Sequence, residues 1–141
     1  RILFSERALF VNMTEEQMTH RVLRAMEQSC VTIFAHPTGR LLLTREPYRI
    51  NLPAVIDRAA ALGVVMELNA HPQRLDLDWR LCRLAKEKGV LISINPDAHS
   101  AEGLSHVRYG VGIARKGWLE KKDVLNTWPV GKIESFLRKR K

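Results

Sequence analysis

The chain has 141 residues, enough for one domain that buries about two thirds of the surface its unfolded form exposes. It carries 23 Lys and Arg against 15 Asp and Glu, and its two cysteines form no Cys-x-x-Cys motif. A disulfide scaffold and a membrane span of about 18 apolar residues are therefore excluded. We expect a single cytoplasmic domain over residues 1–141, without a membrane partner. A closed barrel of eight strand-helix units needs about 250 residues, so alternating strands and helices in this chain would form only part of such a barrel.

The net charge of +8 is concentrated near the carboxyl terminus. Residues 115–141 hold nine basic side chains against Glu120, Asp123 and Glu134. A basic tail of this kind favours a polyanionic partner. The alternative is a solvated helix end whose cations complement the helix dipole.

The sequence first predicts a helix that begins after Thr14 and ends near Gln28. Thr14 and Gln17 match a capping box, and apolar side chains follow at helical spacing. Residues 1–12 show no clear period and predict either a strand or a short helix.

Three apolar runs then alternate with amphipathic segments. The predicted strands are Val31–Ala35, Val64–Leu68 and Val90–Ile94, and the helices between them are Leu52–Leu62 and Asp78–Lys88. Pro and Gly at the helix ends support these boundaries. Further on, the sequence predicts a helix over Glu102–Lys116 with interruptions at Gly110 and Gly112, a short helix over Glu120–Thr127, and an amphipathic piece over Ile133–Leu137.

This alternation predicts an α/β fold with parallel strands and right-handed crossovers. All carboxyl ends of the strands then share one edge of the sheet, the edge where α/β enzymes place their sites. The polar residues expected on this rim are His36, Asn69, His71, Asp97 and His99.

Asp97 and His99 stand two residues apart after an apolar strand, so both side chains can reach one cation. Imidazole and carboxylate together suit zinc, manganese or iron, and mixed sets of this kind activate water in hydrolytic sites. His36 alone is weaker evidence, because a histidine in a loop is more often only hydrogen-bonded.

Two arginines follow the same loops. Arg40 and Arg74 could bind a phosphate group bidentately, with surface ion pairing as the alternative. The roles of Glu67, inside a strand, and of His71, which precedes a proline, stay open at this point.

Several strings resemble a known family. They are His36-Pro37-Thr38-Gly39-Arg40, Glu67-Leu68-Asn69-Ala70, Arg74-Leu75-Asp76-Leu77, Asn95-Pro96-Asp97-Ala98-His99-Ser100 and Tyr109–Leu119. Over residues 12–136 the chain closely resembles the PHP (polymerase and histidinol phosphatase) domain at the carboxyl end of bacterial family X DNA polymerases. The resemblance implies a partial (β/α) barrel of PHP type, the carboxyl-terminal portion of such a domain.

The resemblance also implies a function. PHP domains of this kind are metal-dependent phosphoesterases with zinc or manganese, and in these polymerases they resemble 3′-5′ exonucleases that act in DNA repair. His36, Asp97 and His99 match family metal ligands, Asp97 and His99 would be catalytic, and Arg40 and Arg74 would bind the DNA substrate.

The family's other ligands would precede Arg1, and its histidine before the first helix is replaced by Ala8-Leu9-Phe10-Val11. We therefore expect an amino-terminal half-barrel and a polymerase domain to be absent from this chain, which could be inactive alone. A homodimer or the missing half would complete it. The alternatives are a non-catalytic nucleic-acid-binding or structural remnant and a small-molecule phosphatase of histidinol-phosphatase type.

Overall fold

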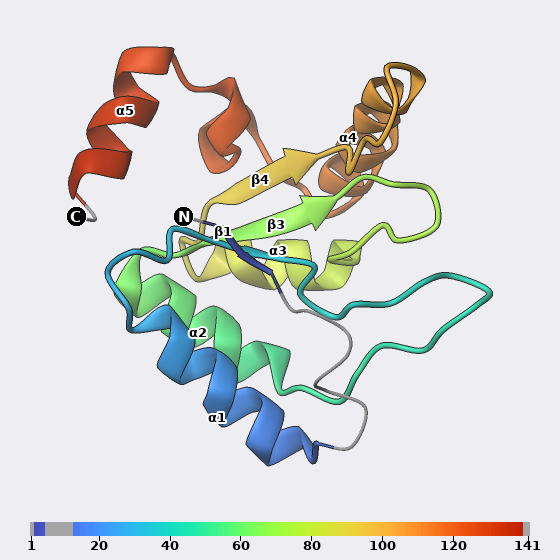
Figure 1. Ribbon diagram of the computed structural model, residues 1–141. Coiled ribbons are helices and arrows are strands. Elements are labelled where there is room, and N and C mark those ends of the chain that lie inside the picture. Colours follow the sequence, from blue (N-terminus) through green and yellow to red (C-terminus); the bar gives the residue numbers. More distant parts are fainter. Residues whose placement is uncertain (1, 5–12, 140–141) are drawn as a thin grey trace.

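The computed structural model describes residues 2–4 and 13–139. The replaced histidine position, at residues 8–11, lies outside this part of the chain. Four parallel strands form one sheet in the order β1-β2-β3-β4 (Figure 1). Their bounds are Ile2–Phe4 (β1), Ile33–Ala35 (β2), Val65–Asn69 (β3) and Ile92–Asn95 (β4). The predicted α/β class with parallel strands is confirmed, whereas the barrel form is not.

The helices connect successive strands and follow the last one. They are α1 (Glu15–Met26), α2 (Leu52–Leu62), α3 (Trp79–Glu87), α4 (Val107–Lys116) and α5 (Val130–Lys139). In Figure 1, α1 and α2 lie together below the sheet, and α5 lies on its upper side. No helix of the described residues is long and apolar enough to cross a membrane.

Local sequence explains the helix ends. The Thr14 side chain accepts a hydrogen bond from the Gln17 backbone, which completes the predicted capping box at α1. Helix α2 has the bounds expected from the sequence, because Pro53 stands in its first turn and Gly63 ends it at φ 66°. Asp78 caps α3 by accepting hydrogen bonds from two backbone N–H groups.

Two predictions after β4 were wrong. Gly110 and Gly112 do not interrupt α4, and a 3₁₀ turn over Glu102–His106 precedes it instead. The segment Glu120–Thr127 forms two 3₁₀ turns rather than one helix.

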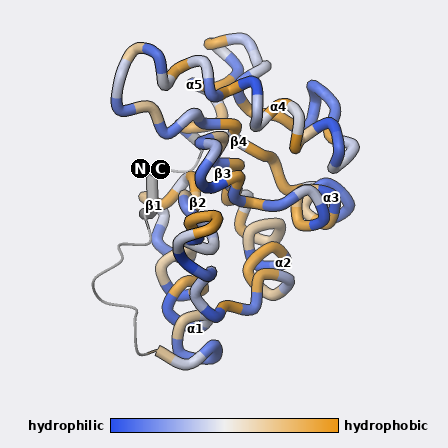
Figure 2. Tube along the Cα trace, turned by 90° about the vertical axis from the view of Figure 1, so that its right-hand side faces the viewer, coloured by the Kyte–Doolittle hydropathy of each residue, from blue (hydrophilic) through white to orange (hydrophobic). Residues whose placement is uncertain are grey.

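The hydrophobic core lies between the sheet and the helices, and hydrophobic residues line β3 and the sides of α2 and α3 that face it (Figure 2). Every residue of β3 is buried. A central strand that is buried on both faces places its carboxyl end, and the polar side chains there, in a protected setting.

Candidate functional site at the carboxyl ends of the strands

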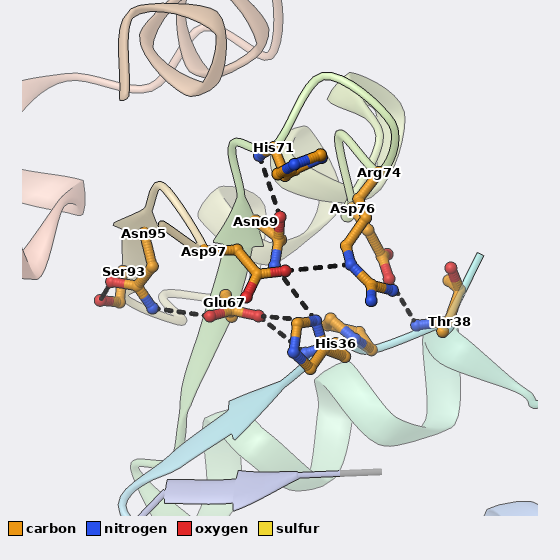
Figure 3. A network of polar contacts seen from close by, with 12 residues as sticks. His36, Thr38, Glu67, Asn69, His71, Arg74, Asp76, Ser93, Asn95 and Asp97 are labelled. Carbon is orange, nitrogen blue, oxygen red and sulfur yellow. Dashed lines mark hydrogen bonds and ion pairs between the residues drawn. The ribbon is translucent and has the colours of Figure 1, made fainter. Parts of the chain in front are cut away.

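Polar side chains from three neighbouring strands meet at one edge of the sheet (Figure 3). His36 follows β2 directly, Asn69 ends β3, and Asn95 ends β4. Asn69 and Asn95 are paired in the strand register, so these two ends lie side by side. The predicted rim is thus formed, and Asp97 lies on it two residues past β4.

Glu67 connects all three strands. Its carboxyl group is buried, with 6% of the side chain exposed. Oε2 accepts a hydrogen bond from the His36 backbone N–H at 2.8 Å, and Oε1 accepts one from Asn95 Nδ2 at 2.8 Å. The same Oε2 lies 3.7 Å from His36 Nδ1. Glu67, whose role the sequence left open, therefore fixes the relative positions of the loops that follow β2 and β4.

Asn69 orients the His36 ring. Its Oδ1 accepts a hydrogen bond from the His71 backbone N–H at 3.0 Å, which assigns the amide nitrogen to the opposite side. That nitrogen, Nδ2, lies 3.1 Å from His36 Nδ1. Because an amide nitrogen donates, His36 Nδ1 is the acceptor in this arrangement.

Asp97 and Arg74 form an ion pair on the rim. Arg74 Nε donates to Asp97 Oδ2 at 3.0 Å, and about a fifth of each side chain is exposed, 22% and 19%. Burial raises the pKa of Asp97, but the hydrogen bond from Asn69 and the charge of Arg74 outweigh it, so the pKa lies below its usual value. Asp97 is therefore a carboxylate at neutral pH.

Arg40 joins the loop that follows β2 to the loop that follows β3. Its Nε donates to the Arg74 carbonyl at 2.7 Å, and its Nη2 donates to the Leu75 carbonyl. Arg74 Nη1 returns a hydrogen bond to the Arg40 carbonyl at 3.4 Å. Both guanidinium groups thus hold the loops together, and their predicted contact with phosphate stays a prediction.

Asp76 is a rim residue to which the sequence analysis assigned no role. Its side chain is fully buried, and Oδ2 accepts a hydrogen bond from the Thr38 backbone N–H at 2.9 Å. The other oxygen, Oδ1, is buried and has no hydrogen-bond partner in the part of the chain that the structure describes. Burial raises the pKa of Asp76, although hydrogen bonds from Thr38 and the charge of Arg40 oppose the shift. A polar residue between two leucines was the only local signal for it.

Three rim residues adopt left-handed backbone conformations that are uncommon for residues other than glycine. The φ angles are 50° at His36, 46° at Leu75 and 54° at Asp97. Such conformations are unfavourable and cluster at functional sites, where the surrounding structure holds them. Here the His36 N–H donates to Glu67, the Leu75 carbonyl accepts from Arg40, and the Asp97 side chain pairs with Arg74.

Three other histidines, His71, His99 and His106, come from the segments that follow β3 and β4. His99 is exposed, and its Nδ1 lies 2.8 Å from the Asp97 carbonyl. His71 contacts His106 edge-on at 4.9 Å between ring centroids, and burial followed by the charge of His106 lowers the pKa of His71. His106 buries its Nδ1, which has no hydrogen-bond partner among the described residues.

The predicted ligands His36, Asp97 and His99 share the rim, but they do not form a complete site. Among the described residues, no group of three or more His, Cys, Asp or Glu side chains is placed to hold a metal ion. Their role as ligands stays a prediction.

No model of a known protein family matches the chain. It is 41% identical over 128 residues to the DNA polymerase/3′-5′ exonuclease PolX of Bacillus subtilis (strain 168), a match that covers 91% of this chain and 22% of that protein. It is 25% identical over 132 residues to probable phosphatases of Thermoanaerobacter sp. (strain X514) and Thermoanaerobacter pseudethanolicus (strain ATCC 33223 / 39E), covering 89% of this chain and 51% of each phosphatase.

The chain thus spans about a fifth of the length of PolX and about half of each phosphatase. The matched part of PolX is its carboxyl-terminal part. Over nine tenths of its length, the chain is therefore a homologue of the carboxyl-terminal part of a DNA polymerase/3′-5′ exonuclease and, more distantly, of probable phosphatases.

Proposed function

We propose that this chain is part of a PHP-type phosphoesterase domain of a family X polymerase, and that it acts on the phosphodiester bonds of DNA at a 3′ end. The observation that carries the proposal is the 41% identity to a protein named as a 3′-5′ exonuclease, together with a polar rim at the carboxyl ends of the strands. We further propose that the described sheet is a portion of a barrel.

Our proposal includes a divalent cation, zinc or manganese, for which His36, Asp97 and His99 supply part of the ligand set. Imidazole and carboxylate suit these metals. The described residues lack a group of three such ligands, so the remaining donors would come from further parts of the domain or from a second copy of the chain. The relatives' greater length supports the first source.

Arg40 and Arg74 are proposed as the phosphate-binding residues. Arg74 already pairs with the Asp97 carboxylate, so a phosphate oxygen could replace that carboxylate without a new cation entering the rim. Arg40 supports Arg74 through a hydrogen bond to the Arg74 carbonyl. A cationic pair at this place would stabilise the negative charge on the phosphoryl oxygens in the transition state.

The test is a hydrolysis assay on 3′-labelled single-stranded DNA with added manganese, alongside calorimetric titration of manganese. We expect Asp97→Asn and His99→Ala to lower both turnover and manganese affinity. His20→Ala is the matched control, because His20 is exposed on α1, far along the chain from the rim. Strong turnover that survives His99→Ala or a chelator would contradict the proposal.

A small-molecule phosphatase is the second candidate, and the match to the two probable phosphatases favours it. Turnover of p-nitrophenyl phosphate and of DNA under the same conditions separates the two. A preference for the monoester, abolished by Asp97→Asn, would favour the phosphatase. DNA binding without hydrolysis, unchanged by a chelator, would favour a non-catalytic remnant instead.

A further inference from the structure

Trp118 stands at an unusual place in the fold. It follows Gly117, the last residue of the turn that ends α4, and its φ is 61°. The Trp118 N–H donates to the Arg115 carbonyl and the Leu119 N–H to the Ala114 carbonyl, both at 3.0 Å. This is the Schellman hydrogen-bond pattern, in which the left-handed position normally holds glycine. A bulky side chain is unfavourable there.

The indole ring gains little from burial in return. Trp118 is 68% exposed, among the most exposed large apolar residues of the described chain. Large aromatic side chains stabilise a fold mainly by burying their surface. A tryptophan that is both exposed and in an unfavourable backbone conformation is better explained by contact with another molecule than by the stability of this chain.

The surrounding structure holds Trp118 in place. Lys86 Nζ donates to the Trp118 carbonyl at 2.6 Å and pairs with Glu120 at 2.7 Å. Gly117 packs against α3 so closely that a Cβ there would lie 2.8 Å from the Trp79 carbonyl oxygen. The ring is therefore presented from a fixed turn, which lowers the entropy lost on binding.

Cationic side chains lie near the Trp118 ring and near the ring of Trp79 on α3. The Arg83 guanidinium carbon lies 4.8 Å from the centroid of the Trp118 ring. Lys116 Nζ lies 5.1 Å from the Trp79 ring, and Arg80 lies 5.6 Å from the same ring. These five residues make up what we call the tryptophan-cation patch. Arg80 and Arg83 also pair with Asp78 and Glu87, whereas no carboxylate of the described residues lies within 4.0 Å of Lys116.

We propose that the tryptophan-cation patch binds a single-stranded polynucleotide, with one base stacked on Trp118 and the adjacent phosphates near Lys116 and Arg83. Every base offers a π-face to an aromatic ring, and single-strand-binding surfaces combine such rings with cations that follow the backbone. The net charge of +8 complements a polyanion. The patch lies outside the rim, so this inference goes beyond the proposed hydrolysis and does not depend on it.

The test measures the fluorescence anisotropy of a labelled oligothymidylate of about ten nucleotides, titrated with the chain in the presence of a chelator. Trp118→Gly removes the ring and suits the left-handed position, so the variant should stay folded by circular dichroism. We expect its affinity to fall about 5- to 150-fold, the range expected for one stacked base. Leu104→Ala, which truncates another exposed side chain (62%), is the control and should bind like the parent chain.

Charge variants provide a second measurement. Arg83→Ala and Lys116→Ala should each weaken binding and lower the slope of log affinity against log salt by about 0.7, the value for one phosphate contact on a single strand. An oligouridylate run in parallel shows whether the strand must be DNA. Unchanged affinity for the oligonucleotide in Trp118→Gly would overturn the inference. So would light scattering that shows the variant to lose self-association while its affinity for the oligonucleotide stays the same. Because a chelator is present throughout, failure of hydrolysis leaves this result unaffected.

Discussion

Replacing Glu67 by alanine tests the central element of the rim. The change removes the acceptor of the His36 backbone N–H and of Asn95 Nδ2, both at 2.8 Å from a carboxyl group that is 6% exposed. A hydrogen bond to a charged group contributes about 1.5–3 kcal/mol, and relief of a buried charge offsets part of the loss. We therefore expect Glu67→Ala to lower the free energy of unfolding by about 2–5 kcal/mol.

Urea denaturation followed by circular dichroism measures this loss, with Glu67→Gln as the matched variant. Glutamine keeps one acceptor oxygen and similar volume, so about half of the stability loss should be restored. In a double-mutant cycle, Glu67→Ala and Asn95→Ala should be coupled by about 0.5–3 kcal/mol, because the two side chains are in direct contact. A loss below about 1 kcal/mol in Glu67→Ala, or an equal loss in Glu67→Gln, would refute this account of the rim.

Three further changes test other parts of the structure. Burial raises the pKa of the Asp76 carboxyl above its ordinary 3.8, so the folded chain holds the proton more tightly than the unfolded chain does, and the free energy of unfolding falls as the pH rises from 3.8 through the folded pKa. Asp76→Asn should flatten this fall in unfolding curves taken between about pH 4 and about pH 8. An unchanged pH profile would count against a buried carboxyl. Asp78→Ala should cost about 0.5–2 kcal/mol in thermal unfolding, because it removes the α3 cap; no loss would mean that the cap does not contribute. Gly110→Ala should lower the free energy of unfolding in urea by about 1–3 kcal/mol, because its Cβ would lie 2.6 Å from Ile94 Cγ2. Gly112→Ala, whose Cβ would meet nothing within 4 Å, should be neutral or stabilising. Equal losses in both variants would contradict this packing.

The strand-helix order could be predicted because its signals are local. Pro53 and Gly63 mark the ends of α2, and their expected positions agree with the structure. The expected interruption of α4 failed because a glycine in a helix can serve packing instead of ending it. Gly110 lets α4 approach Ile94 and Ala70, residues from two different strand ends, and no local pattern encodes that contact.

The location of the polar rim was predictable, but its internal arrangement was not. Parallel topology alone brings His36 and Asp97 to one edge of the sheet. The left-handed φ of both residues and the burial of Asp76 depend on contacts between loops that are far apart in sequence. Arg40 and Arg74 were expected to face a ligand, but they bind backbone carbonyls or a carboxylate. The reason is that the rim has three acidic side chains whose negative charge these arginines compensate, and long loops that they hold together.

The outer side of β4 has a consequence for how copies of this chain can meet. Ile92 forms a parallel bridge to Val124, and the Asn126 side chain accepts from the Ile94 N–H at 2.8 Å and donates to the Ile94 carbonyl at 3.1 Å. The side-chain amide of Asn126 thus makes the two hydrogen bonds that a peptide group of a neighbouring strand would make. A foreign strand could join the sheet at Ile94 only by displacing Asn126 and both of its hydrogen bonds, so this boundary protects the chain against edge-to-edge aggregation.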